Sequence, residues 1–326
     1  MPELPEVETI RRGLERSLVG KSFSDIEIRY ERIFNGEPKD ILDSEIVGIR
    51  RFGKGLVIDF VNDLSIVAHV KMTGQFIYQS NQQSDGRNQN GTSESFHPRL
   101  SLPEELPHKH THVIFTLQNS KSYASNEARL DLARQERSSQ STSSPRTISD
   151  VSMLYFNDIR KFGWIKIVRT EDVHTLSFFK SLGKELPLKD LLGTLSLEEF
   201  GEIVSSSGAP IKTLTMDQRK IAGVGNIYAN DALFLSKIDP RRKANSLEKD
   251  EIALLYRSLI DVLEKGLAHG GASEVNFIQV DGGKGEYQNH FEVYGKAGEN
   301  CTICGTLIER IVVGGRGTFY CPVCQG

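Results

Sequence analysis

The spacing of apolar residues divides the chain into a strand-rich first half and a helix-rich second half. Val7, Ile10, Leu14 and Leu18 recur at helical spacing, which predicts a helix over residues 5–18 with one buried face. Short runs rich in Val, Ile and Phe follow, separated by Gly and Asn, and they predict a β-sandwich or barrel. The expected strands are 24–30, 45–52, 55–61, 64–71, 74–78, 113–117 and 153–156.

Helical periodicity replaces the strand pattern near residues 168–172, where we expect a domain boundary. The expected helical stretches are 172–181, 196–205, 211–236 and 246–269. Residues 79–100 and 119–150 are rich in Asn, Gln, Ser and Gly, so they cannot bury enough apolar surface to offset the entropy of ordering them. We therefore expect two flexible insertions at the surface.

Composition favours a globular chain with more than one core. Apolar residues make up 38% and charged residues 25% of the 326 positions. No apolar run approaches the length of a membrane span, and the first residues are acidic where a signal peptide would be basic, so we expect a cytoplasmic protein with no membrane partner. A net charge of −3 argues against nucleic acid as a partner only weakly, because a local basic face can coexist with an acidic remainder.

All four cysteines lie within the last 26 residues, as two Cys-x-x-Cys pairs separated by sixteen residues. This spacing is typical of a closed, structural four-cysteine zinc site, and two disulfides are the alternative. Ile311 and Val313 alternate before a Gly-Gly turn, which predicts a β-hairpin with Arg316 at its tip. That arginine is placed either to reach a phosphate or only to aid solubility. The expected zinc ligands are Cys301, Cys304, Cys321 and Cys324.

The N-terminus carries a candidate nucleophile. If Met1 is removed, Pro2 becomes a terminal secondary amine, which can attack an electrophilic carbon and form an iminium. Glu3 and Glu6 lie close to it in sequence and can donate or accept protons. The alternative is a proline in the first turn of a helix, with acidic residues favoured by the helix dipole.

Five further residues have a chemical and a structural interpretation. Lys54, between two glycines, suits a phosphate or a reacting group, or is a solvated turn residue. Met72, at a turn, is either a core filler or an apolar wedge between base pairs. Arg160 and Phe162, expected at a strand end, form either a platform for a base or a surface cation–π pair. Asn226, after a Gly-x-Gly turn expected between two helices, either presents donors to a phosphate or caps the second helix.

Three motifs together resemble those of the bacterial formamidopyrimidine-DNA glycosylases. They are Met1 to Thr9, Gly223 to Tyr228 and Gly315 to Cys324. The resemblance implies an α+β multidomain fold with DNA bound in the cleft between two lobes. The implied parts are a β-sandwich domain with an N-terminal helix over 1–169, a helix–two-turn–helix domain over 170–298 with a lesion lid at 272–288, and a zinc finger over 299–326.

The resemblance also implies an activity, the excision of oxidised purines such as 8-oxoguanine and formamidopyrimidines from double-stranded DNA by a monomer that needs only one structural zinc. Pro2 would attack C1′ of a flipped nucleotide and form a Schiff base, and β- then δ-elimination would cut the strand. Glu3 would be the proton donor at the sugar, Lys54 would serve β-elimination and Arg316 δ-elimination, and with Asn226 the last two would hold the kinked backbone. The implied wedge is Met72, Arg160 and Phe162, the further DNA contacts are His69, His110 and Tyr228, and the supporting carboxylates are Glu6 and Asp231.

The chain departs from this family pattern at several positions. Residues 206–210 lack a basic residue that is frequent there, and Asp231 stands where Glu is usual. Ile159 replaces a proline, and the lid lacks a basic or hydroxyl residue near Val275. The two insertions are not family features. The rival functions are excision of oxidised pyrimidines, as in the endonuclease VIII branch, damage binding without catalysis, and a zinc-ribbon adaptor that binds other proteins.

Overall fold

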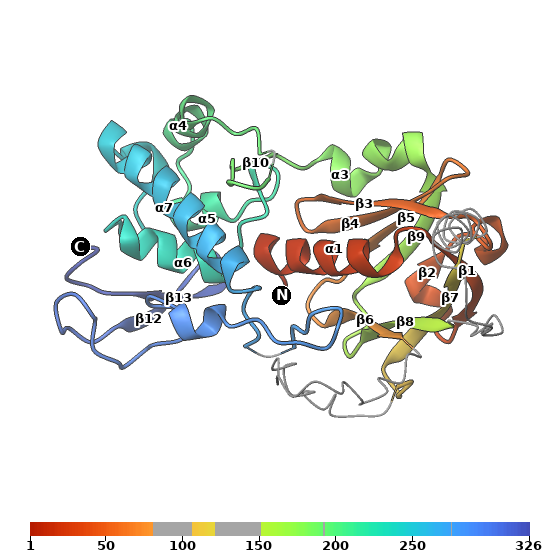
Figure 1. Cartoon of the computed structure of the whole chain (residues 1–326). Helices are drawn as coiled ribbons and strands as arrows, with labels where there is room; N and C mark the ends of the chain where they lie inside the picture. The colour runs from red at the N-terminus through yellow and green to blue at the C-terminus, as the bar shows by residue number, and fades with distance from the viewer. Residues whose placement is uncertain (81–105, 121–150, 192, 275) are drawn as a thin grey trace, which may run out of the picture.

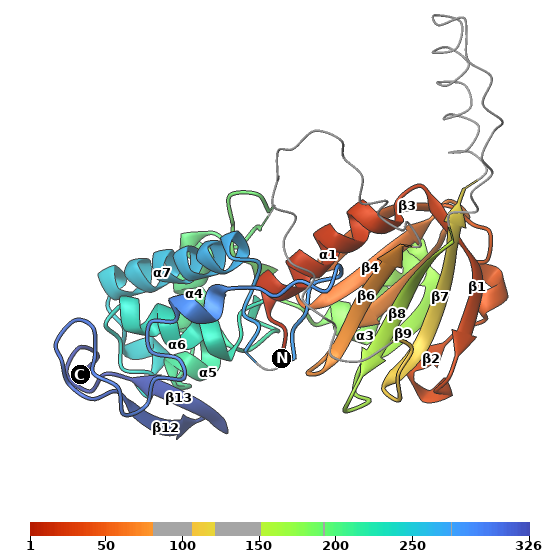
Figure 2. The ribbon, with the colours of Figure 1, turned by 60° about the horizontal axis from the view of Figure 1, so that its bottom comes forward.

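The computed structural model describes residues 1–80, 106–120, 151–191, 193–274 and 276–326, which form two lobes side by side with the N-terminus between them (Figure 1). The view turned by 60° keeps the same arrangement, with the C-terminus at the far end of the helical lobe (Figure 2). The insertions expected at 79–100 and 119–150 lie almost wholly outside the described residues.

The first lobe is a β-sandwich covered by one helix, as the sequence predicts. Helix α1 (Leu4–Leu18) buries Val7, Ile10, Leu14 and Leu18 in the same core as the sheets. The sheets have the orders β1-β7-β8-β6 and β2-β9-β5-β4-β3, and every pairing except β2 with β9 is antiparallel. Their strands are β1 (Lys21–Ile28), β2 (Phe34–Asn35), β3 (Ile46–Phe52), β4 (Gly55–Phe60), β5 (Leu64–His69), β6 (Gly74–Ser80), β7 (Thr111–Asn119), β8 (Ser152–Asp158) and β9 (Trp164–Arg169), with short 3₁₀ turns at Glu31–Ile33 and Pro38–Asp40.

The second lobe is helical, and its longest helix, α7 (Lys249–Ala268), packs against α4 (Leu197–Ser205) and α6 (Asn226–Leu235). The expected helical stretch 211–236 is wrong in its middle, because α5 (Ile211–Thr215) ends early and Ile221–Ala222 forms a short parallel strand, β11, beside β10 (Lys184–Glu185). Likewise, 172–181 divides into a 3₁₀ helix, η3 (Thr170–Thr175), and α3 (Ser177–Lys180). Two more 3₁₀ turns lie at Ala244–Ser246 and Tyr287–His290.

The cysteine-rich end forms the predicted hairpin, β12 (Glu309–Val313) and β13 (Arg316–Tyr320). Gly314 and Gly315 both have positive φ, 58° and 73°, which suits a two-residue hairpin turn and places Arg316 at the tip. The backbone N–H of Phe319 donates to the side chain of Asn230 on α6, at 2.8 Å, so the hairpin is docked on the helical lobe.

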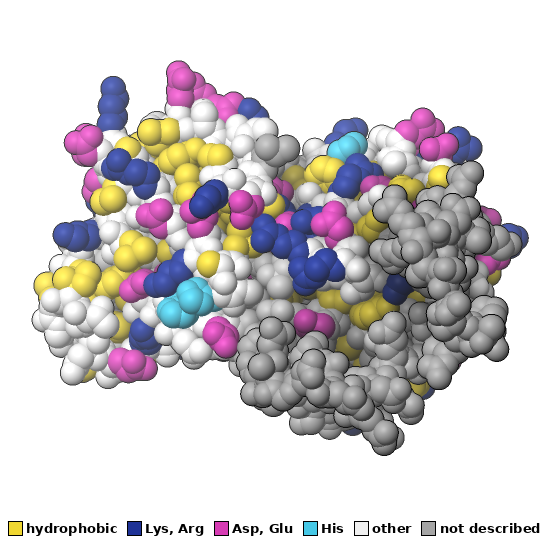
Figure 3. Space-filling view, viewed as in Figure 1, with side chains coloured by type: hydrophobic (Ala, Val, Ile, Leu, Met, Phe, Trp, Pro, Cys, Tyr) yellow, Lys and Arg dark blue, Asp and Glu magenta, His cyan; other side chains and the backbone are white. Residues whose placement is uncertain are grey.

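Two surface properties bear on the possible partners. In the view of Figure 3, Lys and Arg lie among Asp and Glu, so this face carries no uniform basic surface. No helix of the described residues is long and apolar enough to cross a membrane.

Candidate active site between the two lobes

The N-terminal stretch is buried where the two lobes meet. The backbone N–H of Leu4 donates to the carbonyl of Gly223 in the helical lobe, at 3.0 Å. The backbone N–H of Glu3 donates to the carboxylate of Glu6, at 2.8 Å, which fixes the start of α1. Pro2, just before the helix, is also buried. The start of the chain is therefore held by contacts from both sides.

Glu3 places its carboxylate at the N-terminus of α6. Its Oε1 accepts a hydrogen bond from the backbone N–H of Ile227, at 2.9 Å, and its side chain is 3% exposed. Among the described residues, its Oε2 has no hydrogen-bond partner. Burial raises the pKa of Glu3 to about 7, although the charge of Lys54 and the Ile227 N–H lower it. A carboxyl group with this pKa can hold and release a proton near neutral pH.

The Gly-Val-Gly turn makes room for this carboxylate. A Cβ on Gly225 would lie 2.3 Å from the Glu3 carboxyl carbon, and one on Gly223 would lie 2.5 Å from the side chain of Leu4. The expected phosphate-holding hairpin between two helices is thus corrected in two respects. No helix ends at this turn, and the anion at the start of α6 is the Glu3 carboxylate of the chain itself.

Lys54 is buried and points across the interface, so it is not a solvated turn residue. Its side chain is 4% exposed, and its ammonium group donates to the carbonyl of Val224, at 3.0 Å. Burial lowers the pKa of Lys54, while Glu3 and Glu6 raise it and Arg316 lowers it further. The Lys54 ammonium group therefore interacts electrostatically with the carboxylates of Glu3 and Glu6.

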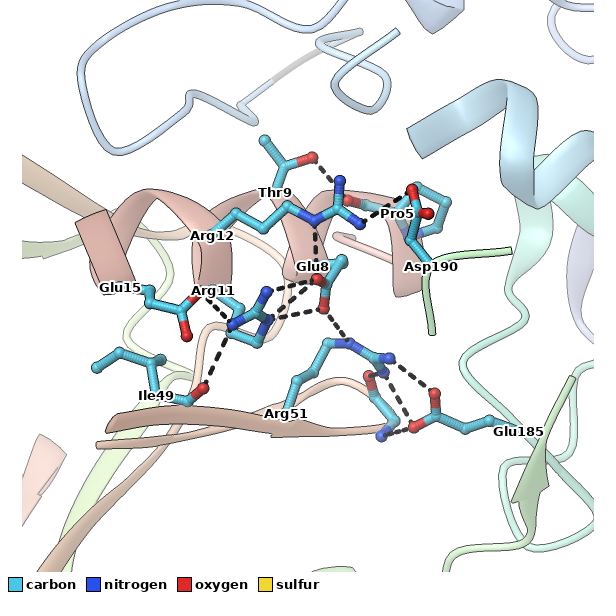
Figure 4. A network of polar contacts seen from close by, with 11 residues as sticks. Pro5, Glu8, Thr9, Arg11, Arg12, Glu15, Ile49, Arg51, Glu185 and Asp190 are labelled. Carbon is cyan, nitrogen blue, oxygen red and sulfur yellow. Dashed lines mark hydrogen bonds and ion pairs between the residues drawn. The ribbon is translucent and has the colours of Figure 1, made fainter. Parts of the chain in front are cut away.

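An ion-pair network holds the turn that carries Lys54 (Figure 4). Glu8, 1% exposed, accepts from Arg51 at 3.0 Å, and Arg51 donates to Glu185 of β10 at 2.7 Å. Glu185 also accepts from the backbone N–H of Gly53, at 2.6 Å, while Arg51 donates to the Gly53 carbonyl. The other cations of this network are Arg11 and Arg12, and the network was not predicted from the sequence.

Asn226 and Lys212, a lysine not predicted from the sequence, hold the finger hairpin close to its tip. The side-chain amide of Asn226 donates to the carbonyl of Gly317, at 3.1 Å. Lys212 is fully buried and donates to the same carbonyl and to the Thr318 hydroxyl, at 2.9 and 2.7 Å. Burial lowers the pKa of Lys212 to about 7. The exposed Arg316 directly precedes this anchored segment, and its charge acts on Lys54.

Three buried side chains form hydrogen bonds inside the protein: those of Glu6, Tyr228 and Asp231. The Tyr228 hydroxyl donates to Glu6 at 2.7 Å, and the same carboxylate oxygen accepts from the backbone N–H of Ala272, the first residue of the expected lid, at 2.8 Å. The Tyr228 side chain is fully buried, and the DNA contact expected of this residue stays a prediction. Asp231, also fully buried, accepts from the backbone N–H groups of Val293 and Tyr294, both at 3.1 Å. Burial raises its pKa to about 6.

The three predicted wedge residues lie together at the surface of the sandwich. The Arg160 guanidinium is 4.8 Å from the centroid of the Phe162 ring and 3.1 Å from the Met72 sulfur. We expected Arg160 and Phe162 at the end of a strand, but they lie in the turn after β8. Asp158 holds this turn by accepting hydrogen bonds from the backbone N–H groups of Arg160 and Gly163. Met72 and Phe162 are 37% and 53% exposed, which is unusual for apolar side chains and fits a contact surface.

The two predicted histidine contacts differ in accessibility. His69 is 4% exposed, its Nδ1 accepts from the Lys71 backbone, and burial with the charges of Lys71 and Lys54 lowers its pKa to about 3, so the ring is neutral. His110 is half-buried, and its carbonyl accepts from the backbone N–H of Asp158, next to the wedge turn. Both histidines stay predicted DNA contacts.

One cavity of about 240 Å³ joins the N-terminus to the wedge and the lid. Pro2, just before α1, and Glu6, in its first turn, line it from the N-terminal stretch, Met72 and Arg160 from the sandwich, and Ile227 from α6. Met1 also lies in its wall, so its removal would open the cavity beside Pro2. The remaining lining residues are Thr73, Ala272, Glu274, Asn276 and Phe277.

The four cysteines fit a zinc ion. Their sulfur atoms all lie within 4.8 Å of one another, and none is in a disulfide. The Cys301–Cys324 and Cys304–Cys321 sulfurs are 3.8 and 3.4 Å apart, close to the roughly 3.8 Å expected for a tetrahedron with Zn–S bonds of about 2.3 Å. The four thiolates would fill the coordination sphere, so the zinc would stabilise the hairpin that carries Arg316 and take no part in chemistry.

Comparisons with known proteins agree with these three parts. The chain matches the family models of the formamidopyrimidine-DNA glycosylase N-terminal domain over residues 1–135, the H2TH domain of the same enzymes over 186–277, and the zinc finger found in FPG and IleRS over 298–326. It is 35% identical to the formamidopyrimidine-DNA glycosylases of Lactiplantibacillus plantarum and Herpetosiphon aurantiacus, covering all of this chain and 99% and 100% of theirs.

Solved structures of Lactococcus lactis Fpg with an abasic-site DNA and with an N7-benzyl-Fapy-dG DNA are each 31% identical, with TM-scores of 0.75 and 99% of both chains covered. The likeness thus extends over the sandwich, the helical lobe and the finger. The chain belongs to the formamidopyrimidine-DNA glycosylase family.

Proposed function

We propose that this chain is a bifunctional DNA glycosylase and AP lyase that removes oxidised purines from double-stranded DNA. One observation carries the proposal. Pro2 lines the cavity that Met72 and Arg160 also line, and the next residue, Glu3, is buried and has a pKa of about 7. A nucleophile, a proton donor and a surface that could replace a flipped base are therefore adjacent. The Lactococcus lactis relatives were solved with damaged DNA, which supports the same partner.

The chemistry starts once Met1 is removed. The Pro2 nitrogen forms a bond to C1′ as the bond from C1′ to the damaged base breaks, and the departing base takes up the proton that the Pro2 amine loses. Glu3 gives its proton to the sugar ring oxygen, the ring opens, and an iminium links Pro2 to C1′. The iminium acidifies the C2′ proton and then the C4′ proton, so β- and δ-elimination break the C–O bonds to the two flanking phosphates.

The cations around Pro2 have separate roles in this proposal. Lys54 serves β-elimination and Arg316 δ-elimination, and with Asn226 they hold the phosphates of the kinked strand. Lys54 is held by the Val224 carbonyl, and the Arg316 hairpin by Asn226 and Lys212. Met72, Arg160 and Phe162 fill the space left by the flipped nucleotide, while His69 and His110 remain proposed DNA contacts. We also infer a monomer that acts in the cytoplasm.

Borohydride reduction during incubation with an 8-oxoguanine duplex tests the mechanism. We expect a covalent protein–DNA complex that disappears in Pro2→Gly, and intact-mass measurement should show that Met1 is absent. No trapped complex, or equal trapping in Pro2→Gly, would refute the Schiff base. Retained Met1 would favour damage binding without catalysis. Substrates with thymine glycol in place of 8-oxoguanine compare purine with pyrimidine excision, and faster cutting of thymine glycol would overturn the purine assignment.

A further inference from the structure

A second cleft, of about 360 Å³, lies on the sandwich lobe. Three segments form it: the turn after β5, the start of β9, and the junction of η3 with α3. Its walls are two aromatic rings and two lysines, with one aliphatic and one hydroxyl side chain between them. The lining residues are Lys71, Trp164, Lys166, Leu176, Ser177 and Phe178.

The aromatic walls are fixed from behind. The rings of Trp164 and Phe178 are 6.0 Å apart and nearly perpendicular, at 77°. Phe178 packs edge-on against the buried Phe179, at 5.1 Å, and against His69, at 4.9 Å. Both wall rings are half-buried, so each keeps part of its surface open to the cleft. The cleft thus offers rigid aromatic faces beside the histidine proposed to contact DNA.

The two lysines give the cleft a positive charge. The Lys71 ammonium lies 6.0 Å from the centroid of Phe178, and that of Lys166 lies 5.5 Å from the centroid of Trp164. Within the described parts of the chain, neither lysine forms an ion pair and no carboxylate lines the cleft. Both charges are therefore available to an anion, next to rings on which a planar group can stack.

We propose that this cleft binds an unpaired nucleotide of the DNA, with its base against Trp164 and Phe178 and its phosphate on Lys71 and Lys166. Aromatic faces interleaved with cations are the combination that recognises single-stranded nucleic acid. A paired base in a duplex is stacked on both sides and cannot enter, so the occupant is a nucleotide at a strand end or in an opened segment. Lys71, which lines the cleft, directly precedes the wedge residue Met72 in the same turn. The inference rests on the proposed function for DNA as the partner.

The test uses Trp164, the only tryptophan of the chain. The zinc-loaded full-length protein is titrated with a thymidine pentanucleotide while Trp164 fluorescence is followed. We expect saturable quenching whose affinity falls with salt at a logarithmic slope of about −1.4, the value for two phosphate contacts on a single strand. Phe178→Leu should weaken binding about fivefold or more through lost stacking. The Lys71→Ala/Lys166→Ala double variant should abolish the salt-dependent quenching.

Two controls separate the possible outcomes. Lys189→Ala removes an exposed lysine of the other lobe and should leave the quenching unchanged. A pentamer of abasic deoxyribose phosphates offers the charges without bases and should not quench. Equal quenching by the abasic pentamer would reduce the cleft to a phosphate site and overturn the proposal, as would no quenching, or quenching unaltered in the double variant. Borohydride trapping on the 8-oxoguanine duplex, in the same preparations, reports on the proposed glycosylase separately.

Discussion

Replacing Glu3 by Gln should stabilise the protein at high pH and abolish excision. The Glu3 carboxyl has a pKa of about 7 in the folded chain, against an ordinary value of 4.5. Because the folded pKa is raised, the folded state binds more protons than the unfolded state between these values. The free energy of unfolding therefore falls as pH rises through this window, and above pH 7 the full penalty of a buried carboxylate applies. The glutamine side chain carries no such penalty.

The size of the effect follows from the two pKa values. Linkage gives a penalty of about 1 kcal/mol at pH 5 and about 3 kcal/mol at pH 8. The stability difference between Glu3→Gln and the parent should therefore change by about 2 kcal/mol in favour of the variant between these pH values. The free-energy cost of burying the glutamine amide does not depend on pH, so it cancels when the two pH values are compared. For a chain of this length the change corresponds to a Tm shift on the order of 5 °C.

Thermal unfolding of the zinc-loaded parent and variant at pH 5 and pH 8 measures this shift. Glu198→Gln is a matched control for the substitution itself, because Glu198 is exposed in the first turn of α4. If the Glu3→Gln and parent Tm values differ by the same amount at both pH values, Glu3 does not titrate as described. A variant that gains stability toward pH 5 would reverse the sign of the argument.

Three further variants test the contacts around the site. Gly225→Ala would place a Cβ against the Glu3 carboxylate, so it should lower borohydride trapping about 100-fold while the circular dichroism spectrum stays unchanged. In the control Gly208→Ala the new Cβ would have nothing within 4 Å, so trapping should not change. Equal trapping in both variants would refute the packing argument. Arg51→Met should lower the free energy of unfolding in urea by about 1–3 kcal/mol, because Glu8 keeps Arg11 and Arg12 but loses one charged hydrogen bond, and Glu185 loses the guanidinium that pairs with it. Arg169→Met, in an exposed pair, should change it by less than about 0.5 kcal/mol. Chelation of zinc, or Cys304→Ser, should make the C-terminal hairpin sensitive to protease while the sandwich stays resistant; a protected hairpin without zinc would contradict the metal assignment.

The sequence predicted those elements whose signals are local. Helix α1 and the long strands follow from apolar periodicity, and the finger hairpin follows from its two glycines and the cysteine spacing. The wedge contact between Arg160 and Phe162 was also predicted, although the residues lie in a turn. In each case the signal lies within a short stretch of the sequence, so the local pattern of residues is enough to predict the element.

Contacts between distant segments were not predictable in this way. The role of Gly225 depends on Glu3, and Tyr228 is buried because its hydroxyl meets Glu6. In the sequence, Lys212 resembles any lysine on a helix. Only the structure shows that it is buried against β13, where it donates to Gly317 and Thr318. A lysine between Ile211 and Leu214, both buried, is the one local sign that its side chain faces inward.

The division of the site between two lobes has a consequence for how activity is lost. Glu3 and Lys54 belong to the sandwich lobe, but both are held by backbone groups of the helical lobe, at Ile227 and Val224. Slight separation of the lobes would release these contacts while each lobe kept its own core and secondary structure. The inactivation curve in denaturant should therefore precede the unfolding curve, and stabilising either lobe alone should leave the inactivation midpoint unchanged.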